Sequence, residues 1–399
     1  MSQIENYKSI LQEIFEIEIN FTNAAIENNC IGGLIENENS NIFCTNFKER
    51  LKRLKKHFKD NNNILIEIIN TAKNIGQTTG YKWAGPYSEL VALDFWLQFA
   101  DIDNIKFPDR GDVDTFADSI AKKIGKEKVD LDISLELSSR KIYTDVKCLI
   151  PTHTELVDKI LLKVRSLTEK QNYLIGIDNL FDVDYLRTKE DFTEELKPDG
   201  LINELVKSID ENKTYHSHAL KSGENATFRI TYYKTDVPVT HSTMREIDVY
   251  KLASDYKYKI LDYYNKLLIE EPSLITLVIN PWFNKELNGF DELFLNTFFR
   301  SLARRVFMEL TKDHTDMGDI IPDLIGKNYK ISEIAEKITG IIFIKDNSVM
   351  QSGTDLYDTY IYLNPNATNK KLTRNDFNIL GCQPHIKKPF IDDFHFDNY

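Results

Sequence analysis

The sequence has little cysteine and lacks the short motifs that would identify a site by themselves. Its 399 residues include four cysteines, none with the paired spacing of a zinc site: Cys30, Cys44, Cys148 and Cys382. The chain contains no GxxxxGK[ST] phosphate loop, no GxSxG elbow and no HExxH helix. We therefore expect reduced, structural thiols in a cytoplasmic protein without intrinsic ATPase activity.

Long apolar runs and an excess of positive charge are also missing. No apolar run approaches the length of a membrane span, and the charged N-terminus MSQIENYKSI lacks the apolar region of a signal peptide. A formal net charge of -12 argues against a uniformly basic coat for nucleic acid, although a local basic groove remains compatible with it. The length suffices for two or three domains.

Residues 128–147 carry the clearest pattern, KVDLDISLELSSRKIYTDVK. Apolar and polar residues alternate on both sides of a short polar segment. This period of two predicts a pair of half-buried antiparallel strands joined by a turn. We expect that turn to centre on Ser139 and Arg140.

This turn would bring polar residues of the two strands onto one face. Asp132 would lie opposite Lys147, and Ser134 opposite Asp145, and cross-strand partners share a face. A slip of one residue would separate them, so the convergence depends on the turn. The simpler alternative is an amphipathic hairpin whose polar face meets water.

An acid also stands in an apolar helix upstream. The segment GPYSELVALDFWLQFADI predicts a buried helix that begins near Gly85 and Pro86, with Glu89 in its first turns. Burying an acid is costly unless a cation pairs with it. A metal or a lysine would supply that pairing. The alternative places Glu89 on an exposed stripe, where the helix dipole favours an acid.

After the hairpin, residues 154–169 have helical spacing, and the apolar run Tyr173–Ile177 is typical of a buried parallel strand. The order of a helical acid, a strand acid and an Asp-x-Lys strand resembles the PD-(D/E)xK nuclease superfamily, over roughly residues 81–180. One departure is that VDLD stands in place of Pro-Asp. Asp130 and Asp132 therefore compete for one role, and the register favours Asp132, with Asp130 as the alternative metal ligand.

The resemblance implies an Mg²⁺- or Mn²⁺-dependent endonuclease that hydrolyses phosphodiester bonds in DNA, of restriction or anti-phage defence type. Asp132, Asp145 and the main-chain carbonyl of Val146 would bind the metal, and Glu89 would complete the site directly or through a water. Lys147 would orient and help deprotonate the attacking water, or neutralise the developing charge.

Other hypotheses stay open. A nuclease-like module that has lost catalysis would serve in nucleic-acid binding or protein interaction, and an RNA-directed nuclease would share the same site. The partners that we expect are nucleic acid, foremost double-stranded DNA, and a second copy of the chain or a partner subunit of a defence system. We expect no membrane partner.

Two clusters of basic residues are candidates for contact with nucleic acid. The helical segment 48–59 carries the first cluster: Lys48, Lys52, Lys55, Lys56 and Lys59. The second cluster lies in a predicted helix further on: Arg300, Arg304 and Arg305. We predict that the first borders the catalytic face; the alternative is a solvated helix face.

The fold that we expect is α/β, with a mixed α+β sheet. A restriction-endonuclease-like αβββαβ core (residues 81–180) would follow an N-terminal helical region (1–80). A helical and β insertion (181–270) would precede a C-terminal α/β region (271–399), whose strands join the core sheet or form a second one and whose tail is irregular.

Overall fold

The computed structural model describes residues 3–21, 41–78, 83–97, 104–112, 119–137, 139–149, 173–181, 215–222, 226–234, 249–280, 292–349, 356–373, 376 and 386–391. The chain divides into two compact units. The first combines Met1–Leu149 with Lys259–Tyr399, and the second is Ile150–Tyr258. The first unit carries the candidate site.

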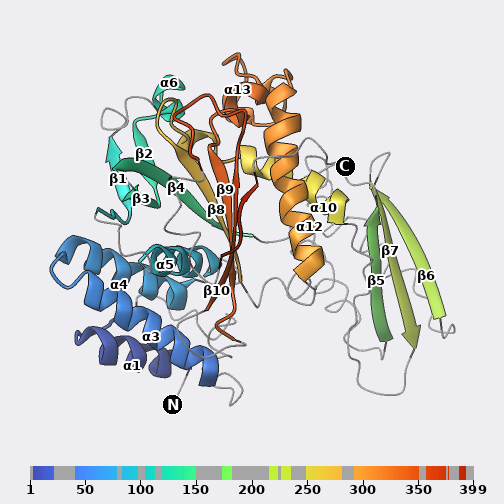
Figure 1. The fold of residues 1–399 in the computed structure, drawn as a ribbon. Helices are drawn as coiled ribbons and strands as arrows, with labels where there is room; N and C mark the ends of the chain where they lie inside the picture. Colours follow the sequence, from blue (N-terminus) through green and yellow to red (C-terminus); the bar gives the residue numbers. More distant parts are fainter. Residues whose placement is uncertain are drawn as a thin grey trace. The chain divides into compact units, whose positions relative to one another are not determined.

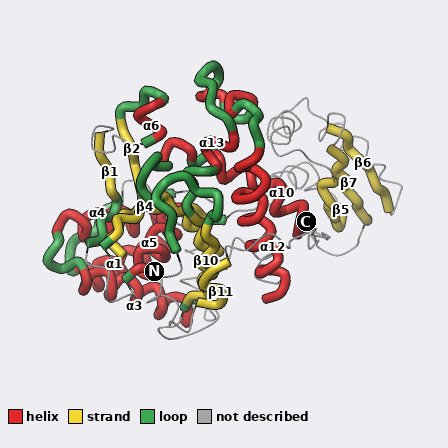
Figure 2. The backbone as a smooth tube through the Cα atoms, turned by 45° about the horizontal axis from the view of Figure 1, so that its top comes forward, coloured by secondary structure: helices red, strands yellow, loops and turns green. Residues whose placement is uncertain are grey.

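A six-stranded mixed sheet forms the centre of the first unit, in the order β11-β10-β9-β8-β4-β3. Strands β4, β8 and β9 are parallel to one another, β3 is antiparallel to β4, and β10 is antiparallel to β9 and parallel to β11. Their bounds are Ile133–Leu137 (β3), Arg140–Cys148 (β4), Ser273–Ile279 (β8), Gly340–Asp346 (β9), Tyr357–Leu363 (β10) and Ile386–Ile391 (β11). Figure 2 shows β11 beside β10.

Four helices from the N-terminal part lie together on one side of this sheet (Figure 1). They are α1 (Gln3–Phe15), α3 (Asn41–His57), α4 (Asn62–Gln77) and α5 (Ala84–Trp96). Helix α5 is apolar around almost its whole circumference and is buried, with contacts to β4, β8, α3 and α4. It is therefore the element that joins the helices to the sheet.

Helix α12 (Glu292–Arg304) covers the other face. Its Phe299 ring lies 4.2 Å from the Phe343 ring of β9 and 4.9 Å from the Tyr360 ring of β10, measured between centroids. Tyr357 of β10 points to the opposite face, where its hydroxyl hydrogen-bonds to Asp94 of α5. The central strands are buried on both faces, which explains the mostly apolar sequence SLITLVI of β8.

Short elements complete the first unit. Strands β1 (Asp109–Asp112) and β2 (Lys128–Leu131) form an antiparallel pair, and α6 (Ile120–Lys123) lies between them in the chain. Five further short elements are η3 (Tyr264–Lys266), the π-helical turn η4 (Arg305–Glu309), η5 (Leu310–Lys312), η6 (Met317–Asp319) and η7 (Pro322–Leu324). Helix α13 (Ile331–Ala335) precedes β9.

The second unit contains an antiparallel sheet with the order β5-β7-β6. Its strands are β5 (Tyr173–Phe181), β6 (Tyr215–Ser222) and β7 (Ala226–Lys234). Helix α10 (Val249–Leu261) crosses the boundary between the two units.

The placement predicted for Tyr173–Ile177 is wrong. This run belongs to β5, which is antiparallel to β7, and the parallel neighbour of β4 is β8. Both runs are short and apolar, so periodicity indicates a buried strand in each case without indicating its partner. The predicted helix 154–169 lies outside the described residues. The division of the chain consequently differs from the domain bounds expected from the sequence, since Ile150–Tyr258 interrupts the first unit.

The expected mixed α/β class is confirmed. Two alternatives were open for the strands after residue 271, and β8, β9, β10 and β11 lie in the same sheet as β3 and β4. Within the described residues, every helix is too short or too polar to cross a bilayer.

Candidate functional site

The hairpin that carries the predicted site differs from its expected register by two residues. Ser134 pairs with Tyr143, not with Asp145, because the turn is centred one residue earlier in the chain. Ser139 in this turn has φ of 64°, as tight two-residue hairpin turns require. A shift of two residues leaves each side chain on its own face, so the predicted convergence is unaffected.

Asp132, Asp145 and Lys147 do converge. The Lys147 Nζ lies 3.0 Å from Asp145 Oδ1 and 3.5 Å from Asp132 Oδ2. The same Asp132 oxygen accepts a 2.7 Å hydrogen bond from the main-chain N–H of Val146. Asp132 is 9% exposed and Asp145 only 3%. The hairpin therefore holds two acids and a lysine in a largely buried cluster, where a water-facing surface was the alternative.

Lys266 is a fourth member that the sequence analysis missed. It ends the short helix η3, and its Nζ lies 2.5 Å from Asp145 Oδ1 and 3.5 Å from Asp132 Oδ1. No motif marks this lysine, because it comes from a segment far from the hairpin in the chain. The one feature of the sequence that could have indicated Lys266 is its position as a cation shortly before the apolar strand β8. We call these four residues, Asp132, Asp145, Lys147 and Lys266, the lysine–aspartate cluster.

The pKa values of the two carboxylates in the cluster are shifted in opposite directions. Burial and the neighbouring charge of Asp132 raise the pKa of Asp145 to about 7. Burial also acts on Asp132, but Lys147 and Lys266 outweigh it and lower the pKa of that group. The pKa of Lys147 is raised, since the attraction of both acids exceeds the effect of burial. Asp132 is therefore the carboxylate that carries charge most readily.

Glu89 of α5 is close enough to the cluster to sense its charges. Burial raises the pKa of Glu89 to about 7, the charge of Asp132 adds to the rise, and Lys147 and Lys266 oppose it. The Glu89 carboxylate has no hydrogen bond or ion pair to another described residue. The predicted acid is thus beside the cluster without direct contact to it.

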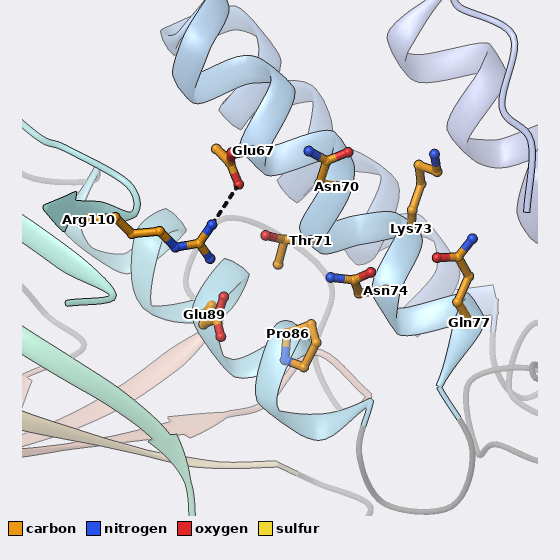
Figure 3. Close-up of a pocket in the computed structure, with 9 residues that line it drawn as sticks. All are labelled: Glu67, Asn70, Thr71, Lys73, Asn74, Gln77, Pro86, Glu89 and Arg110. Carbon is orange, nitrogen blue, oxygen red and sulfur yellow. Dashed lines mark ion pairs between the residues drawn. The ribbon is translucent and has the colours of Figure 1, made fainter. Parts of the chain in front are cut away.

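A polar pocket of about 420 Å³ opens at Glu89 (Figure 3). One face of α4 supplies most of its lining, and β1 contributes Arg110. The lining residues are Glu67, Asn70, Thr71, Lys73, Asn74, Gln77, Pro86, Glu89 and Arg110. Amide, hydroxyl and charged groups dominate, with two cations and two acids among them, so the pocket suits a polar ligand.

Asp130, the alternative metal ligand, takes no part in the cluster. Its Oδ1 accepts a 2.8 Å hydrogen bond from Arg110 Nε, and its side chain is 59% exposed. Arg110 also lies 3.7 Å from Glu67. The structure therefore places Asp132, and not Asp130, with Asp145 and Lys147.

The lysine–aspartate cluster contains potential ligands for a divalent cation. Asp132 and Asp145 offer hard oxygen donors, as Mg²⁺ and Mn²⁺ prefer. The buried Asp145 Oδ2 has no hydrogen bond among the described residues, although Lys147 Nζ is 3.0 Å away. Within the same residues, no set of three or more His, Cys, Asp and Glu side chains could hold a metal. The cluster thus offers a cation two carboxylates, and main-chain oxygens or water would have to complete the coordination.

The first basic cluster lies on α3 and the residues that follow it. Four of its five lysines form ion pairs with acidic side chains. The pairs are Lys48 with Glu13, Lys52 with Glu49, Lys55 with Glu16 and Lys59 with Asp60. Lys56 is exposed. Contact of this helix with nucleic acid remains a prediction.

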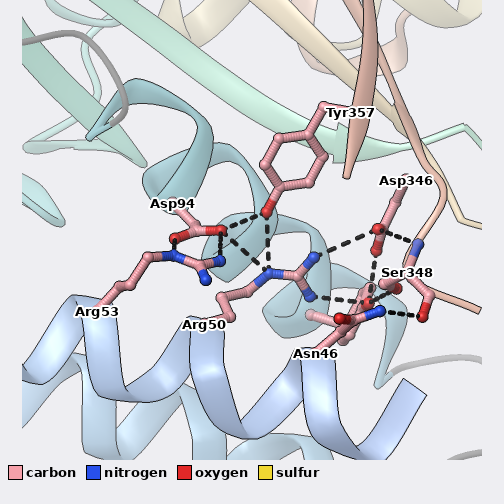
Figure 4. Close-up of polar contacts among 8 residues, drawn as sticks. Asn46, Arg50, Arg53, Asp94, Asp346, Ser348 and Tyr357 are labelled. Carbon is pink, nitrogen blue, oxygen red and sulfur yellow. Dashed lines mark hydrogen bonds and ion pairs between the residues drawn. The ribbon is translucent and has the colours of Figure 1, made fainter. Parts of the chain in front are cut away.

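Arg50 and Arg53 of the same helix have a structural role instead (Figure 4). Arg50 is fully buried, and its guanidinium donates to the hydroxyls of Tyr87 and Tyr357 at 2.9 and 3.0 Å. Arg53 forms two hydrogen bonds with Asp94, at 2.9 and 2.7 Å. This polar network fixes α3 to α5 and to strand β10.

Arg304 and Arg305 of the second cluster contact other residues of the protein. Arg304 lies 2.8 Å from Glu309, and Arg305 is buried and donates to the hydroxyl and carbonyl of Ser301. Burial of Arg305 removes it from the protein surface. Arg300 remains a candidate for contact with nucleic acid.

Comparisons with family models, with curated proteins and with solved structures gave no match to this chain.

Proposed function

We propose that the protein is a metal-dependent endonuclease that hydrolyses phosphodiester bonds in DNA, built on a restriction-endonuclease-like core. The observation that carries the proposal is the meeting of Asp132, Asp145 and Lys147 in one largely buried cluster. Asp132 comes from the bend between β2 and β3, and the Asp-x-Lys pair comes from β4. An acid followed by an Asp-x-Lys strand supplies the residue types that this chemistry uses. The buried Asp145 Oδ2 accepts no hydrogen bond in the described chain and has only the Lys147 ammonium 3.0 Å away, so it is an oxygen ligand that a cation could share.

Each residue has a role that follows from its position. Asp132 and Asp145 would hold Mg²⁺ or Mn²⁺, which when bound lowers the pKa of water and stabilises charge on a phosphoryl oxygen. The Val146 N–H fixes the Asp132 carboxylate in its orientation. Lys147, with a raised pKa, stays protonated and stabilises negative charge near the reacting phosphate.

Glu89 is suited to an indirect contribution. Its carboxylate is close enough to Asp132 for its pKa to respond, yet it forms no contact with the cluster in the described chain. A proton acceptor with a pKa of about 7 can exchange a proton with water at neutral pH. Glu89 would therefore act through a water molecule between the helix and the cation.

The polar pocket beside Glu89 supports a path for the substrate strand. Lys73 supplies positive charge there, Arg110 is shared with Asp130 and Glu67, and the amides of Asn70 and Asn74 supply donors and acceptors. Backbone phosphates need cations, whereas base edges pair with amides. We place the nucleotides that flank the reacting phosphate in this pocket.

A second candidate function is a nuclease-like binding module without catalysis. Lys266 favours it, because this second lysine contacts both carboxylates and neutralises them without a metal. An inactive module would bind DNA with the same affinity with and without divalent cations. An enzyme would cleave DNA only with them.

Incubation of the protein with supercoiled plasmid DNA tests the proposal. Cleavage in Mg²⁺ or Mn²⁺ that stops in EDTA, and that Asp145→Asn abolishes, is the expected result. Cleavage that continues unchanged in EDTA would exclude the metal mechanism. Parallel reactions with single-stranded RNA separate the two substrate classes.

A further inference from the structure

The lysine–aspartate cluster contains two ammonium groups. The Asp-x-Lys motif accounts for that of Lys147 but not for that of Lys266. Its Nζ contacts one oxygen of each carboxylate, at 2.5 Å from Asp145 Oδ1 and 3.5 Å from Asp132 Oδ1. A cation shared by two carboxylates contacts both in the same manner. The Lys266 ammonium therefore stands where a metal held by both acids would compete with it.

The main chain around Lys266 is anchored, which directs the side chain to the cluster. Lys266 N–H donates to Tyr263 at 2.9 Å, and the Leu267 carbonyl accepts a 3.0 Å hydrogen bond from Ile120 N–H. Leu267 is 2% exposed. With its neighbours fixed in this way, the approach of Lys266 to the two acids is a property of the fold.

When both carboxylates are ionised, the charges of the cluster balance without a metal, because two carboxylates face two ammonium groups. A divalent cation would leave two positive charges in excess in a largely buried place, and like charges repel strongly there. One ammonium group must therefore leave the carboxylates when a metal binds.

Lys266 is better suited to leave than Lys147. Lys147 stands on strand β4, and its ammonium also lies over the Tyr263 ring, 5.3 Å from the centroid. Exposure does not separate the two lysines, since 21% of the Lys266 side chain and 28% of the Lys147 side chain are exposed. Lys266 differs in that it projects from a three-residue helical turn and not from a strand of the sheet. Its ammonium group can move toward solvent without a change in the sheet.

We infer that Lys266 is an internal counter-ion that a divalent cation displaces and that then meets the phosphate of the bound nucleic acid. This inference rests on the proposed function and adds regulation to the same site. Without nucleic acid, Lys266 weakens metal binding. With nucleic acid, the displaced ammonium has an anion to pair with, so each ligand favours binding of the other.

Titration calorimetry of the full chain with Mn²⁺ tests the inference by a readout other than activity. Lys266→Met should bind Mn²⁺ about tenfold more tightly than the wild type, since its competing charge is gone. Lys106→Met is the matched control: this exposed lysine lies 3.9 Å from Asp109 and contacts neither acid of the cluster. Its Mn²⁺ affinity should equal that of the wild type.

A second titration adds a DNA duplex with phosphorothioate linkages that resist hydrolysis. The duplex should raise the Mn²⁺ affinity of the wild type several-fold and that of Lys266→Met by less. Thermal melting verifies the folding of each variant. If Lys266→Met does not fold, Lys266→Gln, which keeps a polar side chain, carries the same expectations.

The outcomes separate the inference from the proposed function. If the wild type binds Mn²⁺ and the Lys266 variant binds it with equal or weaker affinity, the inference is overturned and the proposed function is unaffected. Absence of Mn²⁺ binding from both proteins, with and without the duplex, would overturn both.

Discussion

The main-chain N–H of Val146 holds the Asp132 carboxylate through a 2.7 Å hydrogen bond to Oδ2. Val146 stands between Asp145 and Lys147, so this bond ties the acid of one segment to the Asp-x-Lys pair of the next. The geometry of the cluster therefore depends on a contact that could not be predicted from the sequence.

The first prediction concerns this bond and stability. Asp132→Ala leaves a buried N–H without its acceptor and two ammonium groups with one acid, which should lower the free energy of unfolding by about 1–3 kcal/mol. Asp130→Ala removes an exposed pair with Arg110 and should cost less than about 1 kcal/mol. Urea denaturation at pH 7 measures both; equal losses would contradict the account.

The second prediction concerns the buried arginine of α3. Arg50→Met leaves Asp346, 3.3 Å from the guanidinium, without that cation, and should cost about 3–5 kcal/mol. Lys52→Met on the same helix removes an exposed pair with Glu49 and serves as the control, with a loss below about 1 kcal/mol. Thermal unfolding of the two variants checks the difference. A loss for Arg50→Met as small as that of the control would mean that this network does not fix α3.

Local parts of the site follow from the sequence. The alternation in residues 128–147 predicts the hairpin, and the shared face of Asp145 and Lys147 follows from the period of two. The register was two residues wrong, because two adjacent turn positions are compatible with the same polar segment. Since the error was an even number of residues, the faces were still correct.

Long-range parts of the site do not follow from it. Nothing in the pattern of β8 distinguishes it from the apolar start of β5, so the parallel partner of β4 was assigned wrongly. Lys266 and Arg110 reach the site through tertiary packing, and neither lies in a motif. Such contacts are set by the whole fold and leave no local signature.

The third prediction concerns pH. Glu89 has a pKa of about 7 in the folded protein and about 4.3 in an unfolded chain, so folding takes up protons between these values. Its contribution therefore favours the folded state at low pH and is lost as pH rises through about 7. The charged groups that act on it are Asp132, Lys147, Lys266 and Arg110.

Glu89→Gln should flatten the dependence of stability on pH between about 4.5 and 7. At pH 8 the variant should be more stable than the wild type, by on the order of 2 kcal/mol, because no buried charge remains at this position. Denaturation midpoints across this range measure the effect. An unchanged pH profile would show that Glu89 is not perturbed. Asp145, whose pKa is raised too, supplies the slope that persists in the variant.

The fourth prediction decides between two basic surfaces. Lys73→Glu, in the pocket beside Glu89, should weaken DNA binding and lower the slope of log affinity against log salt by about one. Replacement of Lys52 and Lys56 on α3 by Glu tests the earlier expectation for that helix. Fluorescence anisotropy with a labelled duplex at several salt concentrations compares the variants. An effect of the α3 variant alone would move the DNA to that helix and away from the pocket.

The initial rate of Mn²⁺-dependent DNA cleavage in Asp132→Asn and Asp130→Asn tests whether the lysine–aspartate cluster is the catalytic site. The two acids stand two residues apart, and each substitution removes one negative charge, yet only Asp132 contacts Lys147 and Val146. We predict a loss of at least about a hundredfold for Asp132→Asn and a rate within about threefold of the wild type for Asp130→Asn. Equal rates for the two variants, or loss in Asp130→Asn alone, would contradict the assignment of the lysine–aspartate cluster as the catalytic site.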